Sequence, residues 1–230
     1  MDIKAVGFDL DGTLYPGWRM YAVSAGMGLR HPRFFYAFGA ARRALRKTLS
    51  DQNKGRKPQD SNLGSRDALL RFQSDFLATR LGIPPKEAAR LIDARCYRGV
   101  EEKFSTLPPF PGVQKCLEAL KSEGLALGLL SDLPPERKIE RMGLKGYFSA
   151  ILCSEDFGTL KPSSFPFLAL ASKLGAEPGK MVYVGNKVAY DMTGAKNIGM
   201  KTALLGASSH PSVDFCFKSW DALAQWILSL

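Results

Sequence analysis

Cysteine and histidine are scarce in this chain of 230 residues, and neither forms a pattern typical of a metal site or a disulfide framework. The two histidines, His31 and His210, have no metal-ligand spacing. The four cysteines are far apart and make no close pair: Cys96, Cys116, Cys153 and Cys216. Such cysteines are typical of small buried side chains in a reducing compartment. We therefore assign neither residue type a role in binding or catalysis.

Apolar runs long enough to cross a membrane are also missing, since none reaches the roughly 18 residues that such a helix needs. Met1-Asp2-Ile3-Lys4 leads directly into an apolar segment, which leaves no room for a cleaved signal peptide. We therefore expect a cytoplasmic protein. A hydrophobic fraction of 45% in a chain of this length provides a sizeable core, in one large or two small domains.

Basic residues outnumber acidic residues in only one part of the chain. The formal net charge is +10, and residues 14–107 contain 18 Lys and Arg against 8 Asp and Glu. The rest of the chain contains 14 of each sign. The excess positive charge therefore belongs to one continuous segment, which indicates a surface and a task different from those of the rest.

Two aspartates follow the first apolar run and are the most informative residues present. Ala5-Val6-Gly7-Phe8 predicts a buried parallel strand, and Asp9-Leu10-Asp11-Gly12-Thr13 comes directly after it. Gly12 breaks the strand, so both carboxylates are expected at its C-terminal edge, where open α/β sheets bind ligands. Residues two apart in a strand point the same way, so one acid could act as nucleophile and the other as proton donor. A turn with a capping aspartate is the simpler alternative.

Three later segments repeat this arrangement of an apolar run followed by polar groups. They are Leu127–Leu130 before Ser131-Asp132, Ile151–Ser154 before Gly158 and Lys161-Pro162, and Met181–Val184 before Gly185-Asn186 and Asp191. Taken singly, two of these segments have an ordinary explanation. Ser131 would cap a helix before Pro134-Pro135, and Lys161 would be a solvated surface lysine.

The order of expected elements predicts an α/β fold. Helices are expected at 113–122, 135–142, 163–174, 191–198 and 219–229, alternating with strands at 125–130, 150–154, 181–185 and 201–205. This alternation predicts a Rossmann-like, doubly wound parallel sheet. Residues 15–107 interrupt it with helical patterns at about 31–49, from Ser65 onward and at 84–98. We expect two domains, a core of 1–14 and 108–230 and an inserted helical domain of 15–107.

The four motifs in this order resemble the haloacid dehalogenase-like hydrolase superfamily, in its phosphatase branch. The resemblance covers residues 1–14 and about 108–210, and it treats 15–107 as a helical cap inserted after the first motif. It implies that Asp9 attacks phosphorus and that Asp11 protonates the leaving oxygen and then activates water. It implies phosphate binding by Ser131, Asp132 and Lys161. It also implies that Mg²⁺ is held by Asp9, Asp11, Asn186 and Asp191.

Asn186 departs from the family pattern, because most relatives place an aspartate there. An amide supplies an oxygen but no charge, so weaker metal binding is expected. Two alternatives follow: a non-catalytic anion-binding member of the fold, and a haloacid dehalogenase. The second acid, Asp11, favours the phosphatase, because a leaving alkoxide needs a proton and a leaving halide does not. The expected partner is a small phosphorylated metabolite whose identity the sequence does not give, and no obligate protein partner is evident.

A basic run in the segment has three interpretations. Arg42, Arg43, Arg46 and Lys47 lie beside an aromatic group that includes Phe34 and Phe38. We favour a solvated helix face opposite a core-facing stripe. An anionic ligand drawn by the charge, or an interfacial helix on acidic lipid, would use the same residues. Nucleic acid is not expected, because no recognisable binding motif is present.

Overall fold

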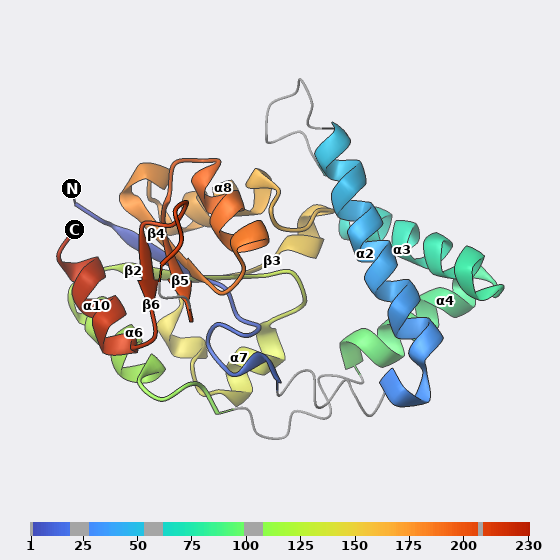
Figure 1. The fold of residues 1–230 in the computed structure, drawn as a ribbon, viewed down its shortest axis with the longest axis horizontal. Helices are drawn as coiled ribbons and strands as arrows, with labels where there is room; N and C mark the ends of the chain where they lie inside the picture. Colours follow the sequence, from blue (N-terminus) through green and yellow to red (C-terminus); the bar gives the residue numbers. More distant parts are fainter. Residues whose placement is uncertain (1, 19–27, 53–61, 99–107, 207–208) are drawn as a thin grey trace.

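The computed structural model describes residues 2–18, 28–52, 62–98, 108–206 and 209–230. Figure 1 shows a sheet with flanking helices and, beside it, a group of helices that stand apart. Parts of the predicted inserted domain, residues 19–27, 53–61 and 99–107, lie outside the described residues.

The sheet has six strands, all parallel, in the order β3-β2-β1-β4-β5-β6. The strands are β1 (Ala5–Phe8), β2 (Ala126–Ser131), β3 (Ala150–Cys153), β4 (Met181–Gly185), β5 (Lys201–Leu205) and β6 (Phe215–Phe217). All four residues of β1 are buried because the strand lies at the centre with helices on both faces. The predicted doubly wound parallel fold is therefore confirmed. Strand β6 was not predicted, since a three-residue strand is too short to show a period.

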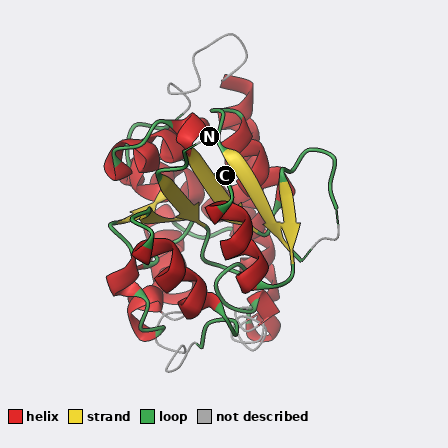
Figure 2. Ribbon diagram, turned by 90° about the vertical axis from the view of Figure 1, so that its left-hand side faces the viewer, coloured by secondary structure: helices red, strands yellow, loops and turns green. Residues whose placement is uncertain are grey.

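Side chains alternate between two cores, one on each face of the sheet. Val6 and Phe8 pack with helices α6 (Val113–Ser122) and α10 (Trp220–Leu228). Ala5 packs on the other face with α8 (Ser164–Leu174) and α9 (Thr193–Lys196). Figure 2 shows the strands between these layers of helices. The remaining helices of this part are short: α7 (Glu136–Arg141), η3 (Lys145–Tyr147), η4 (Ser154–Phe157), η5 (Pro178–Lys180) and η6 (Val188–Met192).

The helical insertion follows β1 and consists of α2 (Pro32–Gln52), α3 (Arg66–Leu81), α4 (Pro85–Ile92) and η2 (Asp93–Arg98). Helix α3 begins where predicted, because the Ser65 hydroxyl accepts a hydrogen bond from the N–H of Ala68. The apolar stripe of α2, including Phe34 and Leu45, is buried as expected. The helix predicted to run to Arg98 instead changes at Asp93 into a π-helix, η2. No helix of the described residues is long and apolar enough to cross a membrane.

Candidate active site

Asp9 lies just beyond the end of β1, and its carboxylate is held from two sides. Its N–H continues the sheet by donating to Val184 O (2.9 Å). The Thr13 hydroxyl donates to Oδ2 (2.7 Å), and Lys161 Nζ donates to Oδ1 (2.6 Å). Gly12 makes the turn possible, since its φ of +89° disfavours any residue with a Cβ. The side chain is 8% exposed, so the Asp9 carboxyl group is fixed and largely shielded from water at the carboxyl edge of the sheet.

Lys161 joins Asp9 to a second predicted site residue, Asp191. Its Nζ lies 2.7 Å from Asp191 Oδ1, and it is buried like both carboxylates. Burial alone would lower the pKa of Lys161, but Asp191 and Asp9 raise it well above its usual range. Lys161 is therefore a buried cation between two acids, and not the surface lysine of the simpler interpretation. Burial raises the pKa of Asp9 to about 7, although Lys161 acts to lower it.

Asn186 presents an unused oxygen at the same edge. Asp191 Oδ2 accepts the N–H groups of Asn186 (3.2 Å) and Lys187 (3.0 Å), which fixes the loop after β4. Asn186 Oδ1 is buried and has no hydrogen-bond partner among the described residues. Its amide nitrogen lies so close to Gly12 that a Cβ there would come within 2.3 Å of it. The loops after β1 and β4 therefore meet at this amide, as the sequence motifs predict.

Asp9, Asp191 and Asn186 offer oxygen atoms of the kind that a hard divalent cation prefers. Within the described ranges, no three His, Cys, Asp or Glu side chains form a group that could hold a metal. A site built from Asp9 and Asp191 therefore needs a further oxygen, and the orphaned Asn186 Oδ1 is of the kind that Mg²⁺ prefers. Asp11, also predicted as a ligand, directs its carboxylate elsewhere, so its metal role stays a prediction.

Asp11 contacts two residues that sequence reasoning missed. Lys138 Nζ, from α7, lies 2.6 Å and 2.8 Å from its two carboxylate oxygens. The Tyr15 hydroxyl donates to Asp11 Oδ1. Burial and the Asp11 carboxylate raise the pKa of Tyr15, so the phenol keeps its proton. Nothing in the sequence marks Lys138, since a lysine on a short helix is normally a surface residue.

Ser131 ends β2 and is buried, at the edge that carries Asp9. Its hydroxyl accepts the N–H of Leu133 (3.2 Å), but it is not the helix cap of the simpler interpretation, because α7 has Pro135 at its N-cap and no capping side chain. Asp132 turns away from solvent. Its Oδ1 accepts the Lys161 N–H (2.9 Å), and its Oδ2 accepts from Arg46 Nη2 (2.7 Å). Burial would raise the pKa of Asp132, but Lys161 and the two arginines Arg46 and Arg42 lower it overall. Phosphate binding by these residues remains a prediction.

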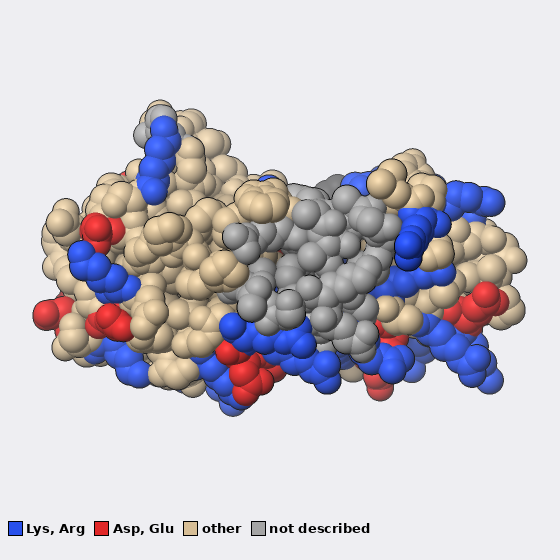
Figure 3. Space-filling model, turned by 90° about the horizontal axis from the view of Figure 1, so that it is seen from below, with Lys and Arg blue, Asp and Glu red and all other residues tan. Residues whose placement is uncertain are grey.

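The solvated-face interpretation of the basic run is wrong for two of its four members. Arg42 pairs with Glu155, which is fully buried in η4, and donates to Asp132 O (3.2 Å). Arg46 pairs with Asp132, and their side chains are 18% and 16% exposed. Arg42 and Arg46 share a helix face because they are four residues apart. The sequence could not reveal this, because the acids lie 86 and 113 residues away along the chain. Arg43 and Lys47 are exposed, and Figure 3 shows other basic side chains on the surface of the insertion.

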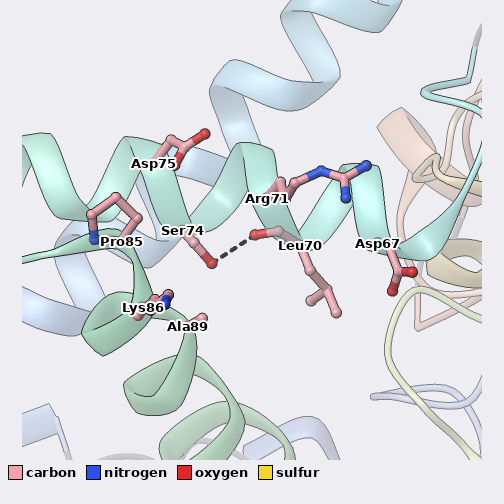
Figure 4. Close-up of a pocket in the computed structure, with 8 residues that line it drawn as sticks. All are labelled: Asp67, Leu70, Arg71, Ser74, Asp75, Pro85, Lys86 and Ala89. Atoms are coloured by element: carbon pink, nitrogen blue, oxygen red, sulfur yellow. Dashed lines mark hydrogen bonds between the residues drawn. The ribbon is translucent and has the colours of Figure 1, made fainter.

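A hollow on the insertion is separate from these residues. It has a volume of about 370 Å³ and is lined only by α3 and α4, as Figure 4 shows. The Ser74 hydroxyl in it already donates to Leu70 O (2.7 Å). None of the predicted site residues lines this hollow.

Comparisons with known proteins identify relatives in sequence and in fold. A glyceraldehyde 3-phosphate phosphatase of Methanopyrus kandleri is 28% identical over 217 residues, which cover 92% of this chain and 88% of that protein. A phosphoglycolate phosphatase of Escherichia coli is 28% identical over 213 residues, covering 86% of this chain and 79% of that one. The solved structure of the L-2-haloacid dehalogenase of Xanthobacter autotrophicus superposes with a TM-score of 0.64 at 18% identity, covering 99% of each chain, and shows a common fold.

A family model described as haloacid dehalogenase-like hydrolase matches residues 3–199. This range contains β1 to β4, the whole helical insertion and every residue placed above at the carboxyl edge of the sheet. The chain therefore belongs to the haloacid dehalogenase-like hydrolase family.

Proposed function

We propose that this protein hydrolyses a small phosphate monoester, with Mg²⁺, through an aspartyl-phosphate formed on Asp9. The observation that carries the proposal is the position of Asp9, fixed between Thr13 and Lys161 with the acid Asp11 two residues further on. A dehalogenase has no use for such a second acid, whereas loss of an alkoxide from phosphorus needs a proton.

In the first step, a carboxylate oxygen of Asp9 forms a bond to phosphorus while the bond to the ester oxygen breaks. Asp11 gives its proton to the leaving oxygen, which departs as an alcohol. In the second step, Asp11 takes a proton from water, the water oxygen attacks phosphorus, and Asp9 leaves as a carboxylate. The Lys161 ammonium and the Ser131 hydroxyl would stabilise negative charge on the phosphoryl oxygens.

Three residues would hold the cation: Asp9, Asp191 and Asn186, with Asp11 as a predicted fourth. When bound, Mg²⁺ would offset the repulsion between the nucleophile and the phosphate. Lys161 offers a single positive charge to the two buried carboxylates, so a divalent cation would balance the negative charge that remains. The amide of Asn186 supplies its oxygen without a charge, so we expect a site of modest affinity.

We also propose that residues 15–107 form a cap that selects the substrate and that 1–14 and 108–230 form the catalytic core. The names of the relatives support a small phosphorylated carbohydrate or hydroxy acid as substrate. All four cysteines are free thiols, in keeping with the cytoplasmic location that we propose.

Turnover of p-nitrophenyl phosphate tests the proposal. Wild type should release phosphate with Mg²⁺, lose activity when the metal is chelated, and regain it when Mg²⁺ is restored. Asp9→Asn should retain less than about a hundredth of the turnover. Release of halide from 2-chloropropionate would favour the dehalogenase instead. Phosphate binding without turnover of any phosphorylated metabolite in a broad screen would favour the non-catalytic alternative.

A further inference from the structure

One cap side chain contacts three of the four site segments. Arg46 Nη2 donates to Asp132 Oδ2 (2.7 Å), and Asp132 directly follows Ser131. Arg46 Nε donates to the backbone oxygen of Lys161 (2.9 Å). The guanidinium also lies over the ring of Tyr190, 4.3 Å from its centroid, and Tyr190 directly precedes Asp191. Each contact is at, or one residue away from, a predicted catalytic or metal-binding residue.

Asp132 connects these contacts to one another. Its second oxygen accepts the Lys161 N–H (2.9 Å), so one carboxylate joins the loop after β2, the loop carrying Lys161 and helix α2. A planar guanidinium presents its Nε and Nη2 donors in a fixed geometry that serves both acceptors while the group stacks on Tyr190, and a lysine ammonium cannot reproduce that combination. Burial of both partners limits screening by salt, so the pair is stronger than an exposed one.

We propose that Arg46, acting through Asp132, is a positioning residue that aligns Ser131 and Lys161 when the cap is seated on the core. The inference rests on the proposed phosphatase function. Arg46 itself touches neither Asp9 nor Asp11 in any contact of the described residues. Its effect is on the reacting geometry, where a displacement of about 1 Å costs up to about a hundredfold in rate.

Neighbouring contacts hold helix α2 in place around Arg46. Arg42, one turn earlier on α2, pairs with buried Glu155, which also accepts from the Tyr97 hydroxyl (2.9 Å). Leu45 and Leu49 of α2 pack against Leu160, next to Lys161. Helix α2 is therefore anchored on both sides of Arg46. Losing the two hydrogen bonds of the Arg46 guanidinium alone need not release the cap.

The test compares Arg46→Gln with Lys47→Gln, its exposed neighbour on the same helix, in p-nitrophenyl phosphate turnover with Mg²⁺. We expect Arg46→Gln to lower kcat about 10- to 100-fold with a smaller change in KM, and to weaken competitive inhibition by inorganic phosphate. Lys47→Gln should keep kcat within about twofold. Arg46→Lys should stay impaired, with a value of log kcat closer to that of Arg46→Gln than to that of wild type. A lysine ammonium does not present two donors in the fixed planar geometry of a guanidinium.

Asp132→Asn isolates the proposed connection, since the amide oxygen can still accept the Lys161 N–H while the carboxylate partner of Arg46 is gone. It should lower kcat as Arg46→Gln does, and the double variant should be little worse than either single variant. Thermal unfolding shows whether each variant is folded at the assay temperature. Folded Arg46→Gln with wild-type or higher kcat, or with losses additive to those of Asp132→Asn, would overturn the inference. Failure of wild type to turn over any phosphate ester would instead refute the proposed function.

Discussion

Lys138 holds both carboxylate oxygens of Asp11, at 2.6 Å and 2.8 Å, across 127 residues of sequence. The lysine side chain is 3% exposed and that of Asp11 15%, so this ion pair is largely shielded from water. The residue that we propose as general acid is therefore fixed by a partner on a different element, α7. Two predictions follow from this pair, one for each member.

Asp11→Asn should slow alkyl phosphates far more than phenyl esters with good leaving groups. General acid catalysis contributes about 10²- to 10⁴-fold, and a leaving group that is already stable as an anion needs little of it. The measurement is kcat for a series of esters graded by the acidity of the leaving alcohol. Equal losses across the series would remove Asp11 from the acid role.

Lys138→Met should show the same dependence on the leaving group with a smaller loss of kcat, about tenfold for alkyl esters. The loss is smaller because Asp11 keeps its carboxyl group and loses only its fixed orientation. Removing one partner of a shielded pair should also destabilise the fold, by about 1–3 kcal/mol. Lys145→Met is the matched control, since Lys145 pairs with Glu140 at the surface, where the side chains are 58% and 64% exposed. If the two variants show the same leaving-group dependence, Lys138 has no part in placing Asp11.

Some site residues are located by the local sequence pattern, whereas others are defined by contacts between distant parts of the chain. The positions of Asp9, Ser131, Lys161 and Asp191 near one edge of the sheet could be predicted, because each comes at or after the end of an apolar run that forms a strand, while their roles stay predictions. Lys138 could not, because its role depends on a carboxylate more than a hundred residues away. The same limit applies to Arg46, whose charge was visible in the sequence but whose partner Asp132 was not. Periodicity locates a side chain on its own element, whereas long-range pairing depends on how elements pack.

Asn186→Asp should tighten Mg²⁺ binding by about tenfold or more, because it places a negative charge where a buried amide oxygen has no partner among the described residues. Calorimetric titration of the metal measures this without reference to turnover. Asn197→Asp, an exposed position at the end of α9, adds the same charge at a residue that is not a proposed ligand and should change the affinity far less. An unchanged or weaker affinity in Asn186→Asp would show that the site is built around the amide or that Asn186 is no ligand.

Asp9→Asn should make the metal-free protein relatively more stable as the pH rises. Burial raises the pKa of Asp9 to about 7 in the folded state, against about 3.9 in an unfolded chain. The folded state therefore binds more protons across this window, and the free energy of unfolding falls as pH rises through it. The neutral asparagine lacks this loss, so the Tm difference between variant and wild type should grow from pH 5 to pH 8. We expect about 5–10 °C, since about two pKa units fall within this window, each corresponds to about 1.4 kcal/mol, and each kcal/mol moves Tm by about 2–4 °C at this size.

Glu118→Gln is the control for this pH dependence, because hydrogen bonds from Tyr147 and Gln114 lower the pKa of the exposed Glu118 carboxyl. A group with a lowered pKa is ionised throughout pH 5 to 8, so the Tm difference of this variant should be flat across the range. Saturating Mg²⁺ should flatten the Asp9→Asn difference as well, since the cation favours the carboxylate of wild type and offsets the cost of its burial. A Tm difference for Asp9→Asn that stays constant from pH 5 to 8 without metal would mean that Asp9 is fully ionised across the range, held so by Lys161 alone.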